Sequence, residues 1–173
     1  MYSPIHQTLS LQVPTGSLHT LRSLVFLNLS YNQIRTVSAG AFRGLVSLLR
    51  LSLLGNRIAT LDAMAFQGLG EKITTLNLGE NLLAQVPSES LKELRVLQRL
   101  LLHKNHIGEL LPDRFPFDGD VLETLSLAGN RIQTLPAAAF ARLGKLASLD
   151  LESNGLIEIH PAAFRGVHGR CHG

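Results

Sequence analysis

LVFLNLSYNQIRTVSAGAFRGL, residues 24–45, is the stretch of sequence that decides the fold, because its pattern returns along nearly the whole chain. A fixed period of roughly 20–50 residues indicates a repeat architecture. Here each copy contains one asparagine, and successive copies lie 24 or 25 residues apart. The asparagines that mark the copies are Asn32, Asn56, Asn81, Asn105, Asn130 and Asn154.

Leucine occupies the positions five and three residues before every one of these asparagines. The two columns are Leu27, Leu51, Leu76, Leu100, Leu125 and Leu149, and Leu29, Leu53, Leu78, Leu102, Leu127 and Leu151. They alternate with variable residues, which is typical of a short β-strand with one buried face. Parallel strands separated by such long connections are joined by right-handed crossovers. The sequence therefore predicts a right-handed solenoid, whose stacked turns share one leucine core and one parallel sheet.

Two further columns complete the predicted core. The position ten residues after each asparagine is expected to close the core opposite the sheet; it is occupied by Phe42, Phe66, Leu91, Phe115, Phe140 and Phe164. The asparagines are expected to point inward, where the strand turns away and leaves backbone groups unpaired. An inward amide can donate to and accept from that backbone, which offsets a desolvation cost of ~1–3 kcal/mol per group.

Each unit reads L-x-x-L-x-L-x-x-N-x-I/L-x-x-V/L followed by A-F-x-G-L, as in Phe42–Leu45 and Phe66–Leu69. This pattern resembles the leucine-rich repeat family. The phenylalanine column resembles the typical 24-residue repeat of its extracellular members, which include matrix proteins, Slit-like and chaoptin-like adhesion molecules and Toll-like receptor ectodomains. The resemblance implies an α/β-type solenoid, a right-handed leucine-rich repeat superhelix with a parallel β-sheet on its concave face. We assign residues 1–20 to a degenerate N-terminal repeat or partial cap, 21–167 to six leucine-rich repeats, and 168–173 to a polar tail.

Both ends depart from the extracellular pattern, which usually includes Cys-rich caps. Cys171 is the only cysteine, and Met1–His6 has neither the basic start nor the apolar segment of a signal peptide. We therefore expect a fragment of a longer secreted or cell-surface protein, with self-association through its uncapped ends. A protein that is truly intracellular is the alternative.

Length, composition and charge narrow the classes of partner. With 173 residues, 45% of them apolar, the chain can form one soluble domain that needs no disulfide or metal. No apolar run approaches the roughly 20 residues of a membrane-spanning helix, so we expect no direct membrane insertion. The 16 Lys and Arg residues against 13 Asp and Glu are too evenly balanced for a nucleic-acid binder, so we expect no nucleic-acid partner.

No residues point to catalysis, a cofactor or a metal. Gly68–Ile73 begins like a dinucleotide-binding loop, but it lacks the third glycine and precedes a strand instead of a helix. The chain has no G-x-S-x-G nucleophile elbow. We interpret His103 and His106 as solvated surface residues, because no carboxylate or thiol shares their strand and turn. The histidines and the cysteine of residues 168–172 lie in the Gly-rich tail, where an unpaired thiol or adventitious metal binding is the simpler interpretation.

The predicted binding surface is the outer face of the sheet, on the concave side of the coil. Basic and apolar side chains gather in its middle, whereas Asp150 and Glu152 make its C-terminal end acidic. Arg50 and Arg99 are expected to stand about 10 Å apart, because they lie two turns from each other. We predict that the partner-binding residues are Phe26, Arg50, Leu54, Arg99, Leu101, His103 and Lys104. Ordinary surface scatter is the alternative explanation of this pattern.

The resemblance implies a non-catalytic protein-recognition module of a secreted or cell-surface protein, in an adhesion, matrix or receptor setting, which binds a protein ligand without a cofactor. The glycosylation sequon Asn28-Leu29-Ser30, whose asparagine is expected to point outward, agrees with secretion. The alternative is an intracellular leucine-rich repeat scaffold or regulatory subunit of a signalling complex. An enzyme would need an attached domain, since nothing among these residues supplies catalysis.

Overall fold

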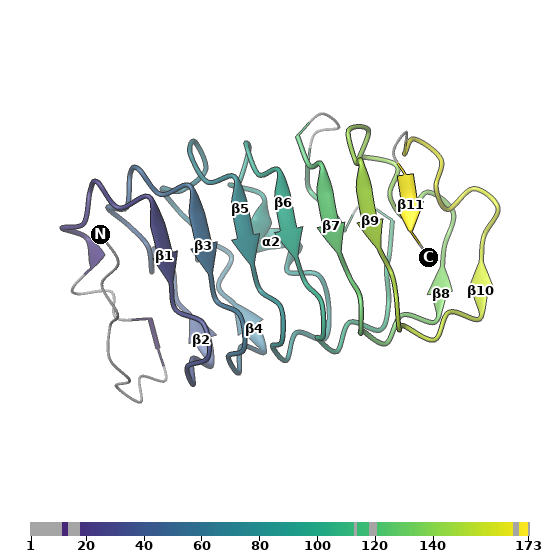
Figure 1. The fold of residues 1–173 in the computed structure, drawn as a ribbon, viewed down its shortest axis with the longest axis horizontal. Coiled ribbons are helices and arrows are strands. Elements are labelled where there is room, and N and C mark those ends of the chain that lie inside the picture. The colour runs from purple at the N-terminus through teal and green to yellow at the C-terminus, as the bar shows by residue number, and fades with distance from the viewer. Residues whose placement is uncertain (1–11, 14–17, 113, 118–120, 168–169, 173) are drawn as a thin grey trace.

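The computed structural model describes residues 12–13, 18–112, 114–117, 121–167 and 170–172. Its main feature is a seven-stranded parallel sheet that receives one short strand from each turn of the chain (Figure 1). The strands are, in spatial order, β1 (Phe26–Asn28), β3 (Arg50–Ser52), β5 (Thr75–Asn77), β6 (Arg99–Leu101), β7 (Thr124–Ser126), β9 (Ser148–Asp150) and β11 (Arg170–His172). The chain winds as a right-handed solenoid, so the predicted fold class is confirmed.

Equivalent positions of the repeat pair with each other across the sheet. Leu27 on β1 is paired with Leu51 on β3, and the same register continues through β5, β6, β7 and β9. Each of these strands buries its central leucine and leaves its two flanking residues at least partly exposed. Side chains at one repeat position therefore form a straight row across the sheet.

The side of the solenoid opposite the sheet is less regular. Two short parallel pairs lie there, β2 (Thr36–Val37) with β4 (Thr60–Leu61), and β8 (Thr134–Leu135) with β10 (Glu158–Ile159). The one-turn helix α2 (Ser88–Leu91) follows Pro87 in the interval between them. Here serine hydroxyls of α2 link the turn to its two neighbours in place of paired strands. Ser90 Oγ donates to the Asp62 carbonyl at 2.9 Å, and Ser88 Oγ donates to the Arg114 carbonyl at 2.6 Å. In the described residues the connecting arcs are mostly turns, with almost no helix.

The predicted core is confirmed. The leucine columns are buried, and the phenylalanine column stacks in two runs opposite the sheet. Phe42 and Phe66 have ring centroids 6.0 Å apart, and Phe140 stacks on both Phe115 and Phe164 at 6.0 and 5.9 Å. Leu91 fills the position between the two runs and is fully buried. Close packing of the turns also restricts the backbone: a Cβ added at Gly70 would overlap a carbonyl oxygen of the next turn.

The asparagines form the predicted ladder, and five of the six are buried, whereas Asn32 in the first copy is half-buried. Asn81 illustrates it: Nδ2 donates to the carbonyl of Leu78 in its own turn at 3.1 Å and to that of Leu53 in the preceding turn at 3.0 Å. Its Oδ1 accepts from the amide of Ile58, again in the preceding turn, at 3.0 Å. The same three kinds of bond are made by Asn56, Asn105, Asn130 and Asn154. Each buried amide thus joins two turns while satisfying backbone groups that would otherwise lack partners.

Most of the segment 1–20, predicted to be a partial cap, lies outside the described residues. Within it, Val13 and Leu18 are buried against the core, and Gln12 forms a parallel bridge with Thr36. At the other end, strand β11 lies in the segment 168–173 that we assigned to a polar tail, and it pairs with β9. No helix in the described part of the chain is long and apolar enough to cross a membrane.

Candidate functional site

The candidate site is the sheet face, which we define as the outer side of strands β1, β3, β5, β6, β7 and β9 and the three residues that follow each strand. Its first row begins at Phe26 and continues in strict register through Arg50, Thr75 and Arg99. Neighbouring strands are ~4.8 Å apart, so the two arginines stand about 10 Å apart with Thr75 between them. Both arginine side chains are exposed. The strand register therefore confirms the predicted order of this row, with Thr75 between the two arginines.

The seven residues predicted to bind a partner extend from β1 to the turn after β6. Phe26, Arg50 and Arg99 begin their strands, and Leu101 ends β6. Leu54, His103 and Lys104 follow their strands. The fold therefore brings these residues onto one surface, with Phe26 beside Arg50 on adjacent strands and Lys104 three residues after the end of β6. Leu54, Leu101 and His103 are half-buried, and Phe26 is 42% exposed.

The three cations of this surface differ in their electrostatic environment. The side chains of Arg50 and Arg99 have no hydrogen bond or ion pair with any residue that the structure describes. Lys104 instead forms an ion pair with Glu80, with Nζ 2.9 Å from Oε1. This contact lowers the pKa of Glu80 and raises the pKa of Lys104. The positive strip expected from Arg50, Arg99 and Lys104 thus contains two unpaired charges and one that is balanced within the chain.

The residue directly before each ladder asparagine adopts a left-handed backbone conformation. Glycine occupies two of these positions, whereas the others are Tyr31, Glu80, Lys104 and Ser153, with φ between 51° and 57°. Such φ values are uncommon for residues other than glycine. Because the register repeats, these side chains form a row just beyond the C-terminal ends of the strands, which we call the edge of the sheet. This row explains why Glu80 and Lys104 meet from adjacent turns.

Glycines leave room for neighbouring side chains to lie flat on this edge. The ring of Tyr31 occupies the space that a side chain at Gly55 would need, and the ring of His103 does the same at Gly79. The hydroxyl of Tyr31 and the nearby His103 also contribute to lowering the pKa of Glu80, although less than Lys104 does. Glu80 was not among the residues predicted from the sequence to belong to this surface. The opposite charges of Glu80 and Lys104, at the same repeat position in consecutive copies, are the signal that could have revealed it.

The C-terminal part of the sheet face is acidic, as predicted. Asp150 uses both carboxylate oxygens within the chain, because Oδ2 accepts from Ser126 Oγ at 3.0 Å and Oδ1 accepts from the amide of Glu152 at 3.1 Å. The side chain of Glu152 is exposed. The sheet face therefore changes from basic near β3 and β6 to acidic at β9.

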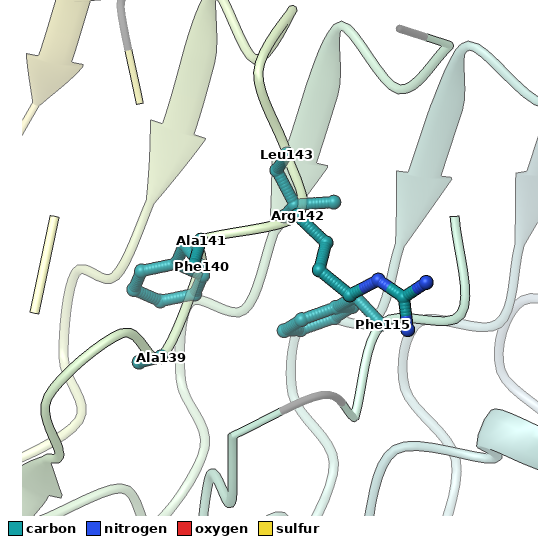
Figure 2. Close-up of a pocket in the computed structure, with 6 residues that line it drawn as sticks. All are labelled: Phe115, Ala139, Phe140, Ala141, Arg142 and Leu143. Carbon is teal, nitrogen blue, oxygen red and sulfur yellow. The ribbon is translucent and has the colours of Figure 1, made fainter. Parts of the chain in front are cut away.

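The described residues contain no group of three or more His, Cys, Asp or Glu that could hold a metal. The side chains of residues 168–173, where the sequence places His168, Cys171 and His172, lie outside the description. Figure 2 shows a hollow lined by the stacked rings of Phe115 and Phe140 and by the residues from Ala139 to Leu143. It is too shallow to enclose a water molecule and offers no site for a small ligand.

Comparisons with known proteins agree with this architecture. The family model described as leucine rich repeat matches residues 5–58, 47–107 and 120–169. A solved structure, the TLR13–ssRNA13 complex, contains a chain that is 27% identical and superimposes with a TM-score of 0.68. The match covers 89% of the present chain and 25% of the TLR13 chain, so the present chain spans about a quarter of the length of the TLR13 chain. No curated protein matches the chain significantly.

Proposed function

This chain belongs to the leucine-rich repeat family, and on that premise we propose that it is a recognition module of a secreted or cell-surface protein that binds its partner on the sheet face. Repeats of this family generally serve protein recognition and are generally non-catalytic. The extracellular setting is supported by the 24-residue repeat with its phenylalanine column and by the likeness to TLR13.

The observation that carries the proposal is a pair of arginines on a regular surface, whose side chains have no partner among the described residues. Arg50 and Arg99 are held in register by strand pairing, so their spacing is set before any partner arrives. A preorganised cation that has no internal partner can give its full electrostatic interaction to a ligand. Leu54 and Leu101 supply apolar contact area on the same face. Arginine is one of the residue types enriched among those that contribute most to protein binding.

The partner that this surface fits is a protein with an acidic patch beside an apolar one. Opposite charge across the interface accelerates association and makes it sensitive to salt. The acidic end of the sheet face, at Glu152, would disfavour a partner whose negative surface extends as far as β9. This arrangement therefore sets the direction in which an acidic partner can lie along the solenoid.

Single-stranded RNA is a second class of ligand to test, because TLR13 is bound to ssRNA in the matching structure. Single-stranded nucleic acid is usually held by a continuous basic groove with aromatic side chains on which the bases stack. Here the two unpaired arginines lie on the same face as Asp150 and Glu152. That mixture of charges favours a protein partner over a phosphate backbone.

The proposal is tested with the double variant Arg50→Glu/Arg99→Glu. Lys104 is left unchanged, because its reversal would place a second carboxylate against Glu80 and disturb the sheet edge. Binding partners are first selected from a library of secreted and cell-surface ectodomains, and affinity is then measured at low and high salt. We expect the double variant to bind ~10–100-fold more weakly, which corresponds to about 1.4–2.8 kcal/mol.

The matched control reverses two exposed arginines in the connecting arcs, Arg43→Glu/Arg165→Glu, which changes net charge equally. The control should keep its affinity. Binding that survives reversal on the sheet face and is lost in the arc control would contradict the proposed surface. Binding of single-stranded RNA that displaces the protein partner would instead support the second class of ligand.

A further inference from the structure

Strand β1 carries a modification motif that the recognition surface does not use. The sequence Asn28-Leu29-Ser30 is an acceptor for N-linked glycosylation, and the other seven asparagines of the chain are not followed by the required Ser or Thr. A three-residue motif alone is weak evidence, so its structural setting decides whether it can be used.

The amide of Asn28 is free in the way that glycosylation requires. The side chain is exposed, and its Oδ1 accepts a hydrogen bond from the amide of Ser30 at 3.0 Å. Its Nδ2, the atom that carries a glycan, has no partner among the described residues. The six ladder asparagines differ, because each uses Nδ2 to donate to backbone carbonyls. A glycan on Asn28 therefore breaks no hydrogen bond within the part of the chain that the structure describes.

The side chain two residues earlier offers a platform for the sugar. Phe26 and Asn28 lie on the same side of β1, since residues i and i+2 of a strand share a face about 6.8 Å apart. Phe26 is 42% exposed, which is unusual for an aromatic residue on a strand. The C–H groups on one face of an N-acetylglucosamine ring can cover such an aromatic ring, which removes apolar surface from water.

We propose that Asn28 carries an N-linked glycan whose first N-acetylglucosamine packs on Phe26. This inference rests on the secreted setting of the proposed function. The donor is a lipid-diphosphate-linked oligosaccharide and the catalyst is the transferase of the secretory pathway. Asn28 Nδ2 forms a bond to the anomeric carbon of N-acetylglucosamine, the bond from that carbon to the phosphate oxygen breaks, and the lipid diphosphate leaves. The proton lost from Nδ2 passes to a base of the transferase.

The glycan gives the recognition surface an N-terminal boundary. Asn28 is paired with Ser52 on β3, so the sugar stands one strand away from Arg50 and three strands away from Arg99. A protein partner is then directed away from β1, toward Arg50 on β3 and Arg99 on β6. Phe26, which we predicted to contact the partner, contacts the sugar instead.

The first experiment locates the modification. The full chain is produced behind a cleavable secretion leader in cultured eukaryotic cells, and its mass is measured before and after treatment with a peptide N-glycosidase, which converts the modified asparagine to aspartate. We expect one occupied site, at Asn28. Asn28→Asp should abolish the modification while keeping an acceptor for the amide of Ser30, whereas the control Ser30→Thr should retain it. A secreted chain without glycan overturns the proposal.

The second experiment tests the contact with Phe26. Enzymatic removal of the glycan should lower the Tm of the protein by about 2–4 °C. In the Phe26→Ala variant the same removal should cause little change, because the platform for the sugar is gone. Equal decreases in both backgrounds would overturn the contact. If the secreted chain carries no glycan but still binds a partner through Arg50 and Arg99, the glycan proposal is refuted and the proposed function stands. If the chain carries the glycan but does not bind through these two arginines, the proposed function is refuted and the glycan proposal stands.

Discussion

Replacing Asn81 with aspartate tests whether the buried ladder holds the turns of the solenoid together. Asn81 is 3% exposed. Its Nδ2 donates to the carbonyl oxygens of Leu53, Leu78 and Gly79, at 2.9 to 3.1 Å. Asn81→Asp keeps an oxygen for the amide of Ile58, which the native Oδ1 accepts, but it turns a second oxygen toward three carbonyl oxygens. The change is nearly isosteric, so its effect reports on polarity and charge instead of on packing.

The expected magnitude follows from these contacts. A buried charge left without its partner costs ~3–5 kcal/mol of the free energy of unfolding, and we expect a loss in that range for Asn81→Asp at neutral pH. Asn81→Ala should cost ~1–3 kcal/mol, because it leaves the buried amide of Ile58 without an acceptor. The carbonyls of Leu53 and Leu78 lose less, since each keeps a bond to another ladder asparagine.

The matched control is Asn77→Asp, four residues earlier. Asn77 Oδ1 accepts from the amide of Gly79 at 2.9 Å, and the side chain is half-buried at the sheet face. Aspartate keeps this acceptor while its charge meets water, so the control should change stability by less than ~0.5 kcal/mol. Asn77→Ala would be a poorer control, because it would remove that hydrogen bond.

Unfolding is followed by circular dichroism in urea and on heating. The difference between Asn81→Asp and its control should appear as a decrease in Tm of roughly 6–20 °C. Burial raises the pKa of the introduced carboxyl, so that group takes up a proton as the pH falls and the loss of stability should shrink on acidification. Equal losses for the two aspartate substitutions would refute the assignment of Asn81 to a buried ladder.

Three further outcomes are expected. Ser90→Ala should lower the free energy of unfolding in urea by ~1–2 kcal/mol, because its buried hydroxyl donates to a carbonyl of an earlier turn; an unchanged value would argue against that link. Gly70→Ala should cost ~1–3 kcal/mol by overlap with the next turn. Gly68→Ala, where a Cβ meets nothing within 4 Å, should cost only about 1–2 kcal/mol of left-handed strain, so a larger loss there would contradict the packing. Lys104→Met should raise the pKa of Glu80 toward its ordinary value of 4.5 in an NMR titration. The ion pair contributes stability above that pH, which is lost as the pH falls through the lowered pKa, so the variant should lose this dependence; an unshifted titration would show that the pair does not form in solution.

Most of the fold could be predicted from the sequence because one period governs it. The leucine positions around Leu27 and Leu29 alternate as a strand requires, and the asparagine that follows them is explained by the backbone groups left at the end of that strand. Phe42 and its equivalents could be assigned to the opposite side of the core, because every turn needs a large apolar side chain there. These inferences depend on hydropathy and spacing, both of which the sequence contains directly.

The arrangement of side chains at the edge of the sheet could not be predicted in the same way. It depends on the left-handed conformation of the residue before each asparagine, and hydropathy does not report φ. Tyr31, Glu80 and Lys104 occupy that position without being glycine, so the usual signal for a positive φ is missing. The hydrogen bonds made by the serine hydroxyls of α2 could not be predicted for a related reason. The partner of Ser90 is a backbone carbonyl, and every residue has one, so the sequence does not single it out.

The difference between Lys104 and Arg99 explains why only some cations of this surface remain free for a ligand. At the left-handed position, side chains lie along the edge of the sheet, so Lys104 meets Glu80 of the adjacent turn. On a strand, side chains stand away from the sheet and reach mainly the row neighbours on either side. Arg99 has Thr75 and Thr124 as its neighbours, and neither is a carboxylate that could neutralise it. A cation in a strand row therefore stays unpaired unless an adjacent copy of the repeat carries an acid, and that condition can be checked in the sequence once the register is known.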